Sequence, residues 1–236
     1  MRVAALYDVH GNLSALEAVL ADSRCAETDA IVCGGDLVAG PMPAACLDLL
    51  LSLGDRVRFL RGNGDREVVA GDGPAGAWCA ARLGEKRLDA VRAWPSLQEL
   101  HVTGLGAVQF CHATPRSDEE IVTQLTPAAE LEEPFERSPG IVVVGHTHVQ
   151  FDRRVGDRRI VNAGSVGAPY EERAGAYWLL LGPRVELVHS EYDTEAALAD
   201  LVATGYPAAA EWLGPALRCE IAPGEAARLF EERRGA

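Results

Sequence analysis

Short apolar runs, each followed by polar or glycine residues, divide the first part of the chain into a regular alternation. Arg2–Tyr7, Ala30–Cys33 and Val57–Leu60 have the length and composition of buried strands. Between them, the stretch after Asn12 and the segment Pro43–Leu53 place apolar residues at helical spacing. This β-α-β-α-β order predicts parallel strands joined by right-handed crossovers.

Beyond this alternation the pattern changes to short strands that pair locally. Leu97–Val102 and Ala107–Cys111 flank a glycine-containing turn and predict a hairpin. The remaining predicted elements are a glycine-rich loop Gly71–Gly76, helices Ala77–Ala93 and Thr126–Arg137, strands Ile141–Val144, Val149–Val155, Arg159–Val161, Ala176–Leu181 and Val185–His189, and a helical tail from Thr194, broken at Gly205–Pro207 and Gly214-Pro215. We expect one α/β domain (α+β by some schemes), residues 1–236, in which a second, largely antiparallel sheet faces the first. Residues 191–236 would form a helical C-terminal extension packed on that domain.

Composition and charge exclude several classes of protein. The hydrophobic and charged fractions, 48% and 24%, are ordinary for a soluble globular chain. No apolar run approaches the roughly 18 residues of a membrane span, and the first apolar stretch is too short for a signal peptide, so a cytoplasmic protein without membrane contact is expected. The six cysteines have no paired spacing and predict buried free thiols. A net charge of −13 disfavours binding to long nucleic acids, so a phosphorylated substrate would need local positive charge.

Side chains that bind cations follow five of the predicted strands. Each one alone is common in ordinary turns, but the carboxyl ends of strands in α/β sheets are where ligands bind. Four of the six histidines fall in these strand-end loops. The candidate metal ligands are Asp8, His10, Asp36, Asn63, His112, His146 and His148.

The donor set indicates which cations would bind. Oxygen and nitrogen donors without thiolates favour Mn²⁺, with Fe²⁺, Zn²⁺ or Ni²⁺ as alternatives, and argue against a structural zinc site. Seven ligands exceed the need of one ion. Two divalent ions about 3.5–4 Å apart and sharing a carboxylate would use them all.

These residues carry a family resemblance. The segments Asp8-Val9-His10-Gly11-Asn12, Gly34-Gly35-Asp36, Gly62-Asn63, Cys111-His112-Ala113, Gly145-His146-Thr147-His148 and Asn162-Ala163-Gly164-Ser165 resemble, in the same order, the motifs of calcineurin-like metallophosphoesterases, and more narrowly the small bacterial predicted phosphodiesterases. The resemblance covers residues from about 1 to 190. It implies a four-layer sandwich of two facing mixed β-sheets flanked by helices, with the metal site at the carboxyl ends of the strands.

The resemblance also implies a role for each ligand. Asp8, His10 and His148 would hold the first ion, and Asp36 would bridge both. The second ion would be held by Asn63, His112 and His146. Hydrolysis would proceed by direct attack of a metal-bound hydroxide on phosphorus, without a covalent enzyme intermediate.

Two further positions bear on the substrate. Many relatives carry a histidine after the motif asparagine, where it protonates the leaving group; this chain has Gly64. Loss of a general acid costs about 10²–10⁴-fold in rate and matters least for acidic leaving groups. Arg116 could bind a substrate phosphate, or form an ion pair with Asp118, Glu119 or Glu120.

The sequence therefore predicts a dinuclear phosphoesterase that hydrolyses a small phosphodiester, a cyclic nucleotide or a nucleotide phosphoanhydride. One alternative is a metal- or nucleotide-binding regulatory protein with vestigial activity, suggested by Gly64. Another is a protein phosphatase. An oligomer is compatible with the sequence.

Overall fold

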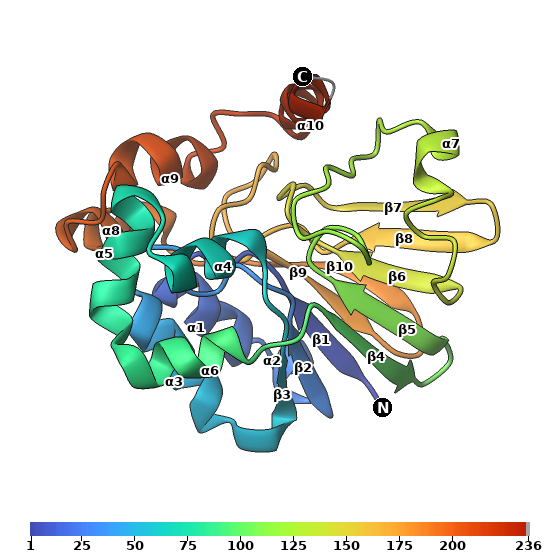
Figure 1. Ribbon diagram of the computed structural model, residues 1–236, viewed down its shortest axis with the longest axis horizontal. Coiled ribbons are helices and arrows are strands. Elements are labelled where there is room, and N and C mark those ends of the chain that lie inside the picture. The colour runs from blue at the N-terminus through green and yellow to red at the C-terminus, as the bar shows by residue number, and fades with distance from the viewer. Residues whose placement is uncertain (235–236) are drawn as a thin grey trace.

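Two five-stranded β-sheets face each other in the computed structural model, which describes residues 1–234 (Figure 1). The first sheet has the order β10-β9-β1-β2-β3, with β1 (Val3–Leu6), β2 (Ala30–Cys33), β3 (Val57–Phe59), β9 (Ala176–Leu181) and β10 (Val185–Ser190). The strands β1, β2 and β3 are parallel, as their helical connections predict. The strands β9 and β10 extend the sheet as an antiparallel hairpin.

The second sheet has the order β4-β5-β6-β8-β7. Its strands are β4 (Leu97–Val102), β5 (Gly106–Cys111), β6 (Ile141–Val144), β7 (Phe151–Val155) and β8 (Arg158–Asn162). The pairs β4–β5 and β7–β8 are antiparallel, whereas β6 is parallel to both of its neighbours. The sheet is therefore mixed rather than largely antiparallel.

Strand β1 is buried on both faces because it lies between two hydrophobic layers. Successive side chains of a strand point to opposite faces. Val3, Ala5 and Tyr7 belong to the core between the two sheets, whereas Ala4 and Leu6 belong to the core under the helices. This double burial explains why the segment reads as a continuous apolar run.

Helices cover the outer face of the first sheet (Figure 1). They are α1 (Leu13–Ala21), α2 (Ser23–Ala26), α3 (Pro43–Ser52), α4 (Asn63–Ala70), α5 (Gly73–Leu83) and α6 (Glu85–Arg92), with a 3₁₀ turn at Gly54–Arg56. The outer face of the second sheet is covered mainly by irregular chain around the short helix α7 (Ala128–Leu131).

Several predicted element boundaries are wrong. The helix predicted over Thr126–Arg137 is reduced to α7, because Pro134 cannot occupy a helix interior without losing a hydrogen bond. The loop predicted over Gly71–Gly76 gives way to α5 at Gly73. The helix predicted over Ala77–Ala93 is divided at Gly84, whose φ of 70° no helix accepts.

The C-terminal helices are α8 (Thr194–Ala203), α9 (Ala209–Leu217) and α10 (Pro223–Arg234). The predicted break near Pro207 is present, but α9 continues through Pro215, and burial of Leu213 and Leu217 compensates for the lost hydrogen bond. Helices α8 and α9 share an apolar cluster with Ala168, close to the loop after β6. The strand predicted from Val149 begins two residues later, at Phe151.

Candidate metal centre

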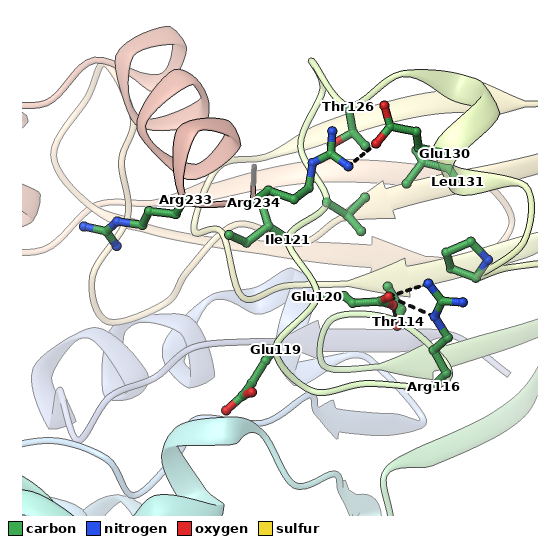
Figure 2. A pocket seen from close by; sticks show the side chains of 12 residues that line it. Thr114, Arg116, Glu119, Glu120, Ile121, Thr126, Glu130, Leu131, Arg233 and Arg234 are labelled. Carbon is green, nitrogen blue, oxygen red and sulfur yellow. Dashed lines mark hydrogen bonds and ion pairs between the residues drawn. The ribbon is translucent and has the colours of Figure 1, made fainter. Parts of the chain in front are cut away.

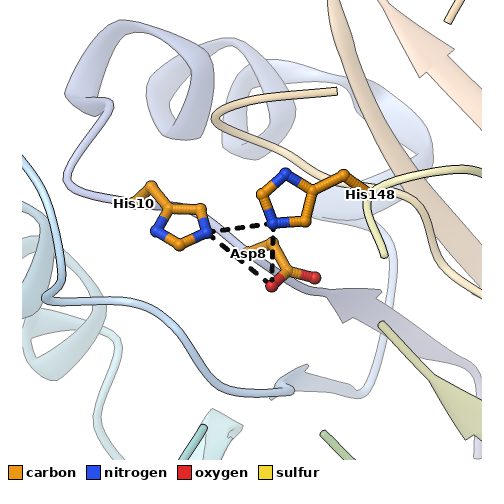
Figure 3. A group of neighbouring side chains, drawn as sticks. All are labelled: Asp8, His10 and His148. Atoms are coloured by element: carbon orange, nitrogen blue, oxygen red, sulfur yellow. Dashed lines mark hydrogen bonds and ion pairs between the residues drawn. The ribbon is translucent and has the colours of Figure 1, made fainter. Parts of the chain in front are cut away.

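Loops at the carboxyl ends of five strands bring the predicted ligands together. Asp8 and His10 follow β1, Asp36 follows β2 and Asn63 follows β3. His112 follows β5, and His146 and His148 follow β6. Two groups have ligand atoms that all lie within 4.8 Å of one another: Asp8, His10 and His148 (Figure 3), and Asp8, Asp36 and His112. All five side chains are buried.

Each aspartate directs one carboxylate oxygen into this centre and has the other held by the backbone. Asp8 Oδ2 accepts a hydrogen bond from the His146 backbone N–H at 2.9 Å, and Asp36 Oδ1 accepts one from the Gly64 N–H at 2.7 Å. The inward Asp8 Oδ1 is buried and has no hydrogen-bond partner. An unsatisfied buried carboxylate oxygen is costly, and a cation bound there would satisfy it. The residues therefore fit a metal ion.

Three histidines are oriented in the same way. His10, His112 and His148 each donate Nδ1–H to a backbone carbonyl, of Ala39, Gly34 and Ala168, at 2.7–3.0 Å. This contact fixes the tautomer, so that the Nε2 lone pair points into the centre, as in metal-binding histidines generally. The Nε2 atoms of His10 and His148 are 3.1 Å apart. Two lone pairs at that separation need a shared cation or proton between them.

The second group adjoins the first. His112 Nε2 lies 3.5 Å from Asp36 Oδ2 and 3.1 Å from Asn63 Oδ1. His146 belongs to neither three-residue group, but its ring lies beside that of His112, with centroids 5.3 Å apart. In this geometry Asp8 takes part in both groups. Asp36 Oδ2 lies 3.5 Å from His112 Nε2 and 3.8 Å from His10 Nε2, so it faces both groups, and its bridging role stays a prediction.

The carboxylates of Asp8 and Asp36 make the centre favourable for positive charge. Burial alone lowers the pKa of His112, but the neighbouring charges of Asp36 and Asp8 outweigh burial and raise it to about 10. For His146, burial and the positive charge of His112 lower the pKa to about 4, which keeps this imidazole neutral. Burial raises the pKa of Asp36, but the positive charge of His112 and its hydrogen bond outweigh burial and hold that pKa well below its ordinary value. The two carboxylates thus favour positive charge in the centre, whether it is carried by His112 or by a bound cation.

Backbone conformation marks the same residues. Among residues 1–234, seven residues other than glycine have positive φ: Asp8, His10, Asp36, His146 and His148, with φ of 48–66°, and Ala208 and Cys219 outside the centre. This left-handed conformation is uncommon for residues with a Cβ and is concentrated at functional sites. Five of the seven predicted ligands are therefore held in strained loops.

Further polar groups position these loops. Asp65 accepts hydrogen bonds from the backbone N–H groups of Asp36, Val38 and Gly62 at 2.8–3.1 Å, so it orients the Asp36 loop through the backbone. Burial and the charge of Asp36 raise its pKa to about 7. Ser165 Oγ donates to the Asp8 carbonyl at 2.7 Å.

The last of the quoted motifs also holds the loop that carries the two β6 histidines. Asn162 Nδ2 donates to the Gly145 carbonyl at 2.7 Å and to Thr147 Oγ1 at 3.0 Å. The motif beginning at Asn162 therefore supports the ligand loops without contributing a ligand.

Position 64 has no room for a side chain. A Cβ on Gly64 would lie 2.7 Å from the Ala39 Cβ and 3.0 Å from Asp36 Oδ1. The backbone N–H of Gly64 also donates the hydrogen bond that holds Asp36 Oδ1. Any larger residue would therefore require Ala39 or the Asp36 carboxylate to shift.

Arg116 forms ion pairs instead of pointing freely at the centre. Its guanidinium contacts Glu120 at 2.6 Å and Glu133 at 2.9 Å. Figure 2 shows Arg116 beside Glu120 in a cavity of about 440 Å³, which Arg233 and Arg234 of α10 also line. The ion pair with Glu120 is one of those predicted, and binding of a substrate phosphate by Arg116 stays a prediction.

Aromatic rings around the histidines were missed by sequence reasoning. The Trp212 ring of α9 meets the His10 ring edge-on at 4.8 Å, and the Tyr170 ring stacks on His148 at 5.6 Å. Phe230 of α10 lies 6.4 Å from the His146 ring. No local spacing could have signalled contacts between residues so far apart in the chain.

Comparison with known proteins agrees with this geometry. Residues 1–181 match the calcineurin-like phosphoesterase superfamily domain. An uncharacterised protein of Methanocaldococcus jannaschii is 28% identical over 243 residues, covering 91% of this chain and 96% of that protein. The crystal structure of a metallophosphoesterase from Sphaerobacter thermophilus is similar, with a TM-score of 0.74 and 25% identity, over 91% of this chain and 98% of that one. A protein of Pyrococcus horikoshii OT3 has the same fold, with a TM-score of 0.77 and 18% identity, over 94% and 99% of the two chains.

The two facing mixed sheets and the cluster of carboxylates and histidines define a metal-binding hydrolase of phosphoric esters. The chain belongs to the calcineurin-like phosphoesterase superfamily. Within the described residues, no helix is long and apolar enough to cross a membrane.

Proposed function

We propose that the protein is a dinuclear phosphoesterase that hydrolyses a small phosphodiester, a cyclic nucleotide or a nucleotide phosphoanhydride. The observation that carries this proposal is the buried, unpartnered Asp8 Oδ1, which lies in both three-residue ligand groups. Asp8, His10 and His148 would hold one ion, Asn63, His112 and His146 would hold the other, and Asp36, which faces histidines of both groups, would bridge the two ions. The oxygen and nitrogen donor set favours Mn²⁺.

The residues of the chain contribute orientation and charge. When bound, two divalent ions supply an acidified water and positive charge for the phosphoryl oxygens. The backbone contacts of Asp8 and Asp36 hold the inward carboxylate oxygens in place, and the Nδ1–H bonds of the histidines hold the Nε2 atoms. Because position 64 has no side chain, no residue there protonates the leaving group, which supports substrates with acidic leaving groups.

The test compares two esters in protein stripped of metal and reloaded with Mn²⁺. We expect turnover of bis(p-nitrophenyl) phosphate, lower turnover of p-nitrophenyl phosphate, and about two ions per chain by elemental analysis. Asp36→Asn keeps an oxygen that can accept from the Gly64 N–H, so the fold should be retained. Its turnover should fall by at least about 10³-fold, or about 4 kcal/mol of barrier, and bound metal should decrease.

The matched control is Asp48→Asn, which removes an exposed aspartate that pairs with Arg87 outside the centre. It should keep wild-type turnover and metal content. Near-native turnover and metal content in Asp36→Asn would refute the assignment of Asp36. Two bound ions without turnover of either ester would instead favour a regulatory, non-catalytic protein.

A further inference from the structure

A cavity rich in arginine opens beside the metal centre. It has a volume of about 280 Å³, close to the lower end of the usual range for small-molecule pockets. His112, whose Nε2 faces Asp36, lines it together with Arg61, Arg66, Ser96 and Arg116. Three guanidinium groups in one small cavity stand out in a chain with a net charge of −13.

The charges of two of these arginines are already matched. Arg66 pairs with Asp118 at 3.0 Å and also with Glu119. Arg116 pairs with Glu120 and Glu133. Their positive charges are thus offset by carboxylates of the chain, so neither leaves an unmatched charge for a ligand.

Arg61 differs from both. Within residues 1–234 its guanidinium has no carboxylate partner, and its side-chain contact is a hydrogen bond from Nη1 to the Arg92 carbonyl at 3.2 Å. A guanidinium carries five N–H donors and is always charged, so most of its donors remain available. Only Gly62 separates Arg61 from Asn63, and the Arg61 backbone N–H is tied to the Pro95 carbonyl at 3.0 Å. The loop that carries a candidate metal ligand therefore also carries an unmatched positive charge.

We propose that Arg61 binds an anionic leaving group, so that the substrate is a phosphoanhydride such as a nucleoside polyphosphate. This inference rests on the proposed function and selects one of its three substrate classes. A water oxygen would form the new bond to phosphorus. The bond to the bridging oxygen would break, and that oxygen would leave on the second phosphate with the bonding electron pair, while the proton released from water passes to solvent. Arg61 would neutralise the departing phosphate, which needs no proton from position 64.

The test uses ATP and bis(p-nitrophenyl) phosphate with the Mn²⁺-reloaded protein. In Arg61→Ala, kcat/KM for ATP should fall by about 10–100-fold, because a hydrogen bond from a charged group is lost. The kcat/KM for the diester should change less than about 2-fold. Arg61→Lys should keep part of the ATP activity because it keeps the charge but not the bidentate geometry. The matched control is Arg58→Ala, since Arg58 lies in β3 and its Nη1 likewise donates to a backbone carbonyl, of Asp55, at 2.6 Å.

A binding measurement separates anion recognition from turnover. Calorimetric titration of metal-free protein with pyrophosphate should show binding that weakens at least about 5-fold in Arg61→Ala and is unchanged in Arg58→Ala. The inference is overturned if wild-type protein does not bind pyrophosphate, or if Arg61→Ala affects both substrates equally and only lowers thermal stability. That last result would mean that Arg61 merely caps the end of α6. Absence of turnover with either substrate in wild type would refute the proposed function itself.

Discussion

At the scale of single residues, the centre is organised by backbone contacts. Two aspartates and three histidines each place one polar atom in the centre and bond the other to a backbone N–H or carbonyl: Asp8, Asp36, His10, His112 and His148. The ligand atoms are thereby held in place before any cation binds. Residue types with two polar atoms are suited to this arrangement, which explains why aspartate and histidine dominate the set.

Asp22, which lies outside the metal centre, should make the stability of the fold depend on pH. Asp22 caps α2, pairs with Arg24 at 2.5 Å and accepts from Ser190 Oγ of β10 at 2.9 Å. The hydrogen bonds from Arg24 are the main reason that its pKa falls to about 2. Since the folded-state pKa lies below that of an ordinary aspartate, about 3.9, the stabilisation is present above pH 4 and is lost as pH falls towards 2.

We therefore expect Asp22→Asn to lower the free energy of unfolding by about 1–2 kcal/mol at pH 7, after allowance for solvent screening. Urea denaturation of both proteins at pH 7 and pH 3 should show a difference that is smaller at pH 3 by about 0.5–1 kcal/mol. A difference independent of pH would mean that the charge of Asp22 contributes nothing.

At the scale of elements, the sequence predicts best where one physical signal dominates. Buried strands read as apolar runs, and the ligands follow them directly, so the first sheet and the five strand-end loops could be predicted from pattern alone. The segment 113–140 could not, because Pro134 and the side chains that cover the second sheet override its helical composition. The aromatic residue Trp212 and the cavity around Arg61 depend on tertiary contacts that spacing does not encode.

The C-terminal helices give a prediction at this scale. We propose that residues 191–236 are an extension packed on a single domain. In α10 only Ala226 and Ala227 are buried among the described residues, and polar contacts such as Thr123 Oγ1 to Glu231 at 2.6 Å tie it to the segment over the second sheet. Helices α8 and α9, in contrast, bury four leucines, Leu198, Leu201, Leu213 and Leu217.

Ending the chain after Ala222 should therefore leave a folded protein and lower its free energy of unfolding by about 2 kcal/mol, since little apolar surface is lost. Ending it after Ser190 removes the four leucines and should yield an insoluble or unfolded protein. Circular dichroism and thermal melting of the two truncated proteins measure the contrast. If both truncations were equally tolerated, the extension would not be part of the folded core.

At the scale of the whole molecule, charge separates the surface from the centre. The net charge of −13 repels polyanions, and two divalent ions would reduce it only to −9. In the centre, buried histidines adjoin the carboxylates, and the guanidinium of Arg61 lines the neighbouring cavity. Small anions reach this local positive charge more readily than a long polymer, which must also approach the acidic surface.

We accordingly expect no appreciable binding of long nucleic acid. Fluorescence anisotropy with a labelled 20-base-pair DNA duplex at about 50 mM salt should give a dissociation constant weaker than about 1 mM, beyond the 10⁻⁴–10⁻⁶ M typical of non-specific DNA-binding proteins. Micromolar, salt-sensitive binding would show that the surface charge does not limit the substrates to small molecules.

The left-handed backbone conformation lowers the stability of the fold at five of the predicted ligands: Asp8, His10, Asp36, His146 and His148. At these positions, the residue that is best for stability is not the one that can bind a metal ion. Each such residue costs on the order of 1 kcal/mol relative to a glycine, which adopts the conformation freely. A chain selected only for stability would therefore accumulate glycine at these five positions and lose its ligands. We expect relatives that have lost catalysis to carry glycine at these positions more often than relatives that retain it.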